Sequence, residues 1–145
     1  MKTITLIAFM LANSAFICSA KAQVGKTYEE GQVTVITYIK VEYGRFNDYA
    51  KWLTSTWKPT MEAKKKAGLI VDYKVFSVRP KSPDEPNVLL MLTYKNMAGL
   101  DKAAEEEAVA EKVIGSAEVQ DGARVQRTEY RKVLGSELIR ELILK

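Results

Sequence analysis

Four side chains in this sequence have the type and placement to bind a small molecule: Tyr38, Trp52, Tyr73 and Arg140. Tyrosine and tryptophan combine a large apolar ring with one polar group, so they suit a pocket for an apolar or aromatic ligand. Arginine binds carboxylates through two parallel hydrogen bonds, and it stays charged throughout the pH range of proteins. These four residues are therefore the candidate ligand-binding residues of the chain.

Each candidate also has a structural interpretation. Tyr38 and Tyr73 lie in predicted strands and could pack across neighbouring strands with their hydroxyl groups at the rim. Arg140 shares its strand face with leucines, and an arginine on an apolar face must be paired. Its partner is predicted to be a carboxylate across a subunit interface, with the anionic group of a ligand as the alternative. Trp57 is predicted to lie in the core, and Arg79 and Arg131 are further candidates to bind an anion.

The composition excludes several kinds of catalysis. The sequence contains no His and a single Cys, Cys18. This removes His-based acid–base chemistry, Ser-His-Asp triads and metal sites rich in His or Cys. No loop has the ligand spacing of a calcium site, and no glycine-rich loop could bind a phosphate chain. We predict no metal and no cofactor, so an enzyme built from this chain would depend on Tyr, Trp, Asn or carboxylate groups.

The first 22 residues have the pattern of a signal peptide. Lys2 provides a positive start, residues 4–17 form a largely apolar run without charge, and Ala20-Lys21-Ala22 fits a cleavage site. The run is shorter than the roughly 20 residues that a bilayer requires. We expect cleavage after Ala22 and export to the periplasm or beyond, with no membrane contact afterwards.

The charge of the chain argues against a nucleic-acid partner. The sequence has 22 Lys and Arg against 18 Asp and Glu, a formal net charge of +4. Removal of Lys2 and Lys21 with the leader would reduce this excess by two. The strand over 88–94 also lacks the paired aromatic residues on which RNA-recognition domains stack bases.

The hydrophobic pattern predicts one α+β domain over residues 32–145, preceded by a polar arm over 23–31. Alternating apolar residues predict strands over 33–43, 69–79, 88–95 and 137–144. Helical periodicity predicts helices over 45–67 and 100–114, and a third helix over 124–134. Pro59 should kink or break the first helix near Lys58. Residues 116–122 are predicted to form a loop.

This β-α-β-β-α-(α)-β order is the ferredoxin-like arrangement, a four-stranded antiparallel sheet with its helices on one face. Adjacent residues such as Val35 and Ile36, or Leu90 and Met91, make both faces of the strands apolar. A monomer would expose one of these faces as an apolar patch, which soluble proteins usually avoid. We therefore predict a homodimer that joins sheet to sheet.

The aromatic segment 46–53 and the terminal segment 133–141, in this order of elements, resemble uncharacterised exported members of the dimeric α+β barrel superfamily. The resemblance covers roughly residues 33–144. That superfamily includes cofactor-free monooxygenases, EthD-like proteins, haem-degrading enzymes and small binding modules. The resemblance implies an exported binding protein for a small apolar or aromatic ligand. The alternative is a cofactor-independent enzyme, monooxygenase- or isomerase-like, with its pocket between helices and sheet.

Overall fold

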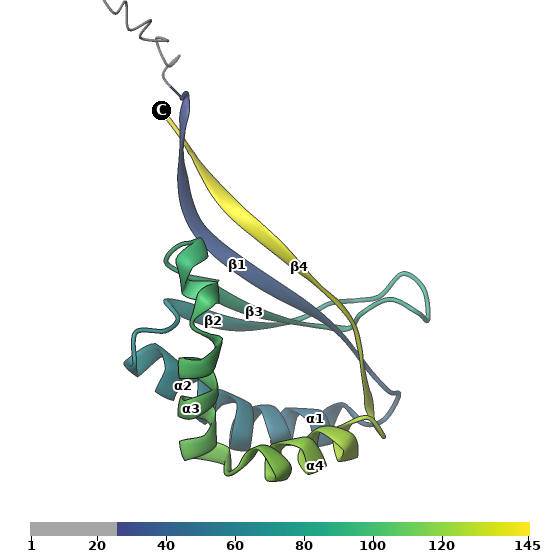
Figure 1. Cartoon of the computed structure of the whole chain (residues 1–145). Helices are drawn as coiled ribbons and strands as arrows, with labels where there is room; N and C mark the ends of the chain where they lie inside the picture. The colour runs from purple at the N-terminus through teal and green to yellow at the C-terminus, as the bar shows by residue number, and fades with distance from the viewer. Residues whose placement is uncertain (1–25) are drawn as a thin grey trace, which may run out of the picture.

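A computed structural model describes residues 26–145, and the predicted signal peptide over 1–22 lies outside the described residues. These residues form one four-stranded sheet in the order β2-β3-β1-β4, and every neighbouring pair of strands is antiparallel (Figure 1). The strands are β1 (Tyr28–Val41), β2 (Asp72–Ser77), β3 (Val88–Tyr94) and β4 (Arg131–Leu144). The α-helices are α1 (Phe46–Trp52), α2 (Lys58–Lys66), α3 (Ala103–Ile114) and α4 (Ala117–Arg127). The expected α+β, ferredoxin-like fold is confirmed.

Two shorter helical segments complete the order of elements. A π-helical turn, η1 (Leu53–Trp57), joins α1 directly to α2, and a 3-10 helix, η2 (Met97–Asp101), precedes α3. The helices gather on one side of the sheet (Figure 1). Among residues 26–145, no helix is both long enough and apolar enough to cross a membrane.

The core lies between the sheet and the helices. Val33, Ile39 and Val41 of β1 are buried, as the alternating pattern predicts for one face of a strand. Ile39 and Val41 belong to a layer that also contains Val88 and Leu90 of β3. The helices cover it with Tyr49, Trp57 and Met61. Each fully buried aliphatic side chain of this kind stabilises the fold by about 1.5–3 kcal/mol relative to exposure.

The first helical region changes its geometry before Pro59. In a regular α-helix the proline ring would clash with the carbonyl group four residues earlier, and proline has no N–H to donate. The π-helical turn over Leu53–Trp57 widens the helix at that point, and Pro59 follows as the second residue of α2. The expected disturbance near Lys58 is therefore a widened turn in a continuous helical path.

The largest differences from the predicted boundaries lie at three places. Residues 28–31, expected in a polar arm, belong to β1 and pair with β4. The helix α4 occupies 117–127, where a loop over 116–122 was expected. Residues 131–134, expected in a third helix over 124–134, open β4, and Gly135 lies inside that strand. The long pairing with β1 overrides the local helical pattern. The register of the pairing shifts between Tyr38, which pairs with Gly135, and Ile39, which pairs with Val133, so Leu134 is an extra residue at this bulge.

The outer parts of β1 and β4 extend beyond the other two strands (Figure 1). β3 pairs with β1 only from Val33 onward, so residues 28–32 of β1 have only β4 as a neighbour. We call residues 28–32 and 140–144 the terminal ribbon. Its apolar side chains Leu142, Ile143 and Leu144 are all exposed. An isolated two-stranded ribbon is marginally stable in water, so the terminal ribbon would gain stability from packing against another surface.

Candidate functional site

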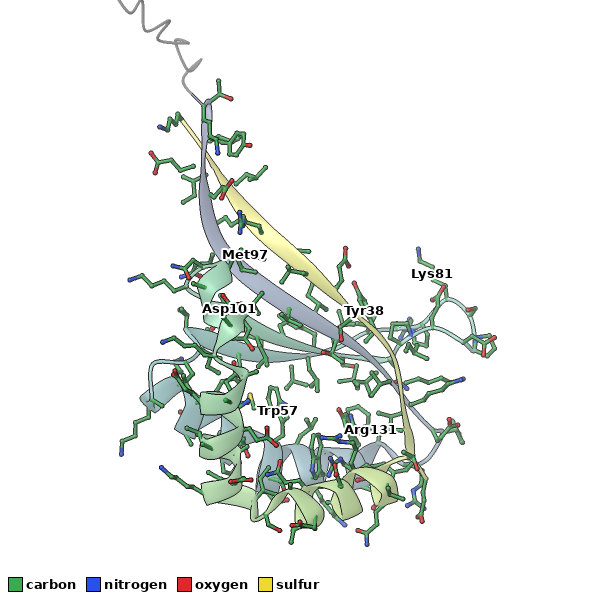
Figure 2. All side chains as sticks on the ribbon, in the orientation of Figure 1. Tyr38, Trp57, Lys81, Met97, Asp101 and Arg131 are labelled. Carbon is green, nitrogen blue, oxygen red and sulfur yellow. The ribbon has the colours of Figure 1, made fainter. Side chains whose placement is uncertain are left out.

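A groove of about 410 Å³ lies between the π-helical turn and the edge strand β2. Apolar and aromatic side chains dominate its lining, which consists of Ala50, Leu53, Thr54, Trp57, Lys58, Tyr73 and Val75. A volume of this size is in the range of small-molecule pockets. Figure 2 shows Trp57 in the space between the sheet and the helices.

Trp57 and Tyr73 define the shape of this groove. Their rings meet edge to face, with centroids 5.3 Å apart and planes at 85°. Tyr73 faces the helices because it pairs with Leu92 of β3, which lies opposite Val35 of β1. The π-helical turn adds a residue to the helical turn and so sets the direction in which Trp57 projects.

Both hydroxyl groups of the groove, those of Tyr73 and Thr54, already have hydrogen-bond partners. The Tyr73 hydroxyl donates a short hydrogen bond to Glu62 of α2. This bond is the main cause that raises the pKa of Tyr73 to about 12, and burial and the negative charge of Glu62 add to it. The Thr54 hydroxyl donates to the backbone carbonyl of Ala50 at 3.0 Å. The groove therefore presents a neutral phenol rather than a reactive phenolate.

Tyr38 lies on the opposite face of the sheet from this groove. Its neighbour Ile39 is buried among the helix-facing residues, so alternation turns Tyr38 the other way. Its hydroxyl donates to Glu137 Oε2 at 2.6 Å, which raises the pKa of Tyr38. The structure does not bring Tyr38 together with Trp52 and Tyr73.

Trp52 belongs to a different cluster, on the flank of α1. Its ring stacks on Tyr49 with centroids 5.4 Å apart and planes at 20°. The guanidinium carbons of Arg127 and Arg131 lie 4.5 Å and 5.1 Å from the Trp52 centroid. Trp52 is not among the side chains that line the groove.

Arg140 is held by a carboxylate, as predicted, but the partner lies in the same chain. Its Nη1 donates to Glu30 Oε2 at 2.5 Å. The expected partner across a subunit interface is wrong, because β1 begins earlier than predicted and carries Glu30 alongside β4. The sheet order places two strands, β3 and β1, between Arg140 and β2, so Arg140 does not reach the groove at Tyr73.

Sequence reasoning thus found Tyr73 and missed most of the groove. Trp57 was assigned to the core alone, although it both packs in the core and lines the groove. The signal that could have found it is Pro59, since a proline inside an aromatic helix marks a local change of helical geometry. Leu53 and Val75 carry no signal of their own, because nothing in the local pattern brings a helix residue and an edge-strand residue together.

Comparison with known proteins identifies the fold. No protein-family model and no curated protein matches the chain. A dimeric ferredoxin-like protein from an uncultured marine organism is similar in structure, with a TM-score of 0.51 and 15% identity over 81% of this chain and 98% of that one. A second dimeric ferredoxin-like protein from an uncultured marine organism has a TM-score of 0.50 and 11% identity over 81% and 90% of the two chains.

A protein of Shewanella oneidensis is similar to the same degree, with a TM-score of 0.50 and 17% identity over 80% of this chain and 96% of that one. At these identities the likeness concerns the fold alone. The chain has the fold of dimeric ferredoxin-like proteins, which confirms the resemblance at the level of architecture.

Proposed function

We propose that this protein binds a small apolar or aromatic molecule in the groove between η1 and β2. The observation that carries the proposal is the perpendicular pair of Trp57 and Tyr73 in a groove of about 410 Å³. An aromatic ligand can stack on one ring and meet the edge of the other, which is the preferred geometry of aromatic contacts. Leu53 and Val75 supply the apolar walls.

Binding is favoured over catalysis by the state of the polar groups. Tyr73, with a pKa of about 12, is neither a general base nor a good acid near neutral pH. The alternative is a cofactor-independent enzyme, in which the Tyr73 and Glu62 pair would pass a proton to or from a bound substrate. Conversion of a bound compound by the purified protein, lost in Tyr73→Phe, would favour this alternative.

The binding proposal is tested by calorimetric titration with indole and phenol as neutral aromatic probes. Val75→Glu places a charged group on the apolar wall of the groove, and we expect it to weaken binding by about tenfold or more because a bound aromatic ring would have to displace water from the carboxylate. The matched control is Val71→Glu, since Val71 is similarly exposed (38% against 43%) and lies outside the groove. Equal affinities of the two variants would contradict the proposal.

We propose further that the protein acts as a homodimer. The sheet face without helices carries Phe76 and Ile139 as exposed apolar residues, and the terminal ribbon exposes Leu142, Ile143 and Leu144 on its two faces. Neighbouring exposed apolar side chains of this kind are characteristic of interaction surfaces. A second copy is the occupant that fits, because two of the structurally similar proteins are described as dimeric.

Export of the mature chain is part of the same proposal. It rests on the sequence pattern of residues 1–22, with cleavage after Ala22. The intact mass of protein recovered from the periplasm or the medium is the test. A chain that still begins at Met1, or that is lipidated on Cys18, would contradict it.

A further inference from the structure

Three buried polar groups beside α1 have no hydrogen-bond partner among the described residues. They are the hydroxyl of Tyr49, the indole Nε1 of Trp52 and the Nε of Arg127. All three can donate a hydrogen bond, and two of them can only donate. Buried donors are nearly always paired in folded proteins, so this cluster lacks an acceptor.

The same cluster also lacks a negative charge. The guanidinium groups of Arg127 and Arg131 lie over one tryptophan ring, and Arg131 is also 5.7 Å from the Tyr49 centroid. None of the ion pairs within residues 26–145 includes Arg127 or Arg131. Burial lowers the pKa of Arg127, and the positive charge of Arg131 lowers it further.

Stacking on the aromatic rings does not satisfy these arginines. A cation–π contact uses the flat face of the guanidinium and contributes about 0.5–2 kcal/mol. The N–H groups project from the edge of the same plane, where they remain free to bind two oxygen atoms of one anion. Trp52 and Tyr49 therefore orient the arginines, while the Nε of Arg127 has no hydrogen-bond partner among the described residues.

A hollow of about 520 Å³ leads from the surface to Arg131. It lies where α4 ends and β4 begins, and its lining consists of Glu42, Arg124, Thr128, Arg131, Lys132 and Val133. Three of these side chains are basic and one is acidic. Arg131 pairs with the buried Val41 across the sheet, which turns it inward, and Figure 2 shows it between the sheet and the helices.

We propose that this hollow is a binding site for an oxyanion, either a carboxylate or a phosphate group. Arg131 binds the anion through N–H groups that no ion pair within residues 26–145 uses, and Arg124 and Lys132 contribute charge at the rim. The anion also balances the charge of Arg131, which lies over the same Trp52 ring as Arg127. This site shares no lining residue with the groove at Trp57 and Tyr73, so it does not depend on the function proposed there.

The test is titration of the full mature chain with inorganic phosphate and, separately, with acetate, each at constant ionic strength set by sodium chloride. Tryptophan fluorescence reports binding because Arg131 and Arg127 contact Trp52. We expect saturable binding that Arg131→Gln weakens by about tenfold, the loss of one strong charged contact. The matched control is Arg79→Gln, because Arg79, the other anion-binding candidate of the sequence, is exposed after β2 and does not line the hollow, so its loss should leave the affinity unchanged.

A second variant keeps the test decisive if Arg131→Gln does not fold, as judged by circular dichroism. Arg124→Gln combined with Lys132→Gln removes two exposed charges at the rim and should weaken binding without affecting the fold. The relative affinities for phosphate and acetate identify the anion. The proposal is overturned if neither anion gives a saturable signal, or if the Arg131 and rim variants bind as tightly as Arg79→Gln.

Failure of this site is distinguishable from failure of the groove. Val75→Glu should abolish binding of aromatic probes and leave anion binding intact, because Val75 does not line the hollow. Arg131→Gln should have the opposite effect. If each variant affected both ligands equally, the two sites could not be separate.

Discussion

A tyrosine whose hydroxyl donates a hydrogen bond to a carboxylate has a raised pKa. Tyr73 bonds to Glu62 and Tyr38 to Glu137, and both hydroxyls have raised pKa values for that reason. Ionisation of either tyrosine would break its hydrogen bond and place two negative charges side by side. At the scale of single residues, these contacts determine how the protein responds to alkaline pH.

We predict that the Tyr73 contact stabilises the protein fully below pH 10 and is lost as pH rises toward 12. In this interval the unfolded tyrosine, with its ordinary value of 10.0, ionises while the folded one, at about 12, stays neutral. The unfolded state then binds fewer protons, so stability falls as pH rises. In an ultraviolet titration, the Tyr73→Phe variant should show one fewer phenol with a raised pKa than the parent protein. The control variant Tyr43→Phe, at a fully exposed site, should show as many as the parent.

Two ion pairs of different burial should contribute very differently to stability. Lys64 Nζ lies 2.6 Å from Glu106 Oε2 between α2 and α3, and both side chains are only 13% exposed. Arg140 and Glu30 are 31% and 47% exposed. We predict that Glu106→Ala costs about 3 kcal/mol, because it leaves a buried ammonium unpaired.

For Arg140→Met we predict a cost of about 0–1 kcal/mol, as for other solvent-screened pairs. This corrects the expectation of a desolvated arginine, since Glu30 and Arg140 both remain partly accessible. Urea midpoints measured at one protein concentration compare the two substitutions. A cost for Arg140→Met as large as that for Glu106→Ala would contradict this prediction and show that the Arg140–Glu30 pair is desolvated in the assembled protein.

At the scale of elements, two glycines show that the effect of this residue on helix stability depends on its position. Gly68 follows α2 with φ of 71°, the left-handed conformation that glycine favours at helix ends. Its N–H donates to Lys65 O, and the N–H of Leu69 donates to Lys64 O, both at 3.0 Å. Gly122 lies inside α4, where a glycine weakens the helix relative to alanine.

We predict opposite effects for alanine at these two positions. Gly68→Ala should destabilise by about 1 kcal/mol, because a Cβ is strained at positive φ. Gly122→Ala should stabilise by about 0.5–1 kcal/mol, since a Cβ there would meet no atom within 4 Å. Thermal unfolding of the two variants measures the difference. If Gly122→Ala lowered the melting temperature, α4 would not be a regular helix in solution.

At the scale of the whole molecule, the exposed sheet face and the terminal ribbon predict assembly. We expect light scattering to give twice the mass of the mature chain. Phe76→Glu combined with Ile139→Glu should shift the protein to the monomer, because two buried carboxylates would face an apolar partner. Val119→Glu, on the exposed surface of α4, is the control and should leave the dimer intact. A monomeric parent protein would contradict the proposal.

The sequence by itself determined the order of helices and strands along the chain, and it determined which residues of each strand share a face. Alternation has a period of two residues, so Val33, Ile39 and Val41 are assigned to one face without knowledge of their neighbours. The same reasoning placed Tyr38 and Ile39 on opposite faces. The predicted helix end at residue 67 also agrees with the structure, in which Gly68 follows with φ of 71°, because a left-handed cap depends on a single residue.

Only the tertiary structure decided which residues meet. Tyr73 reaches Trp57 because β2 pairs with β3, and Arg131 turns inward because β4 lies opposite Val41. Residues 131–134 have a helical pattern yet form a strand, since hydrogen bonds to β1 outweigh weak local preferences. Both candidate sites join residues far apart in the chain, and contacts of that kind follow from strand pairing and helix packing rather than from local periodicity.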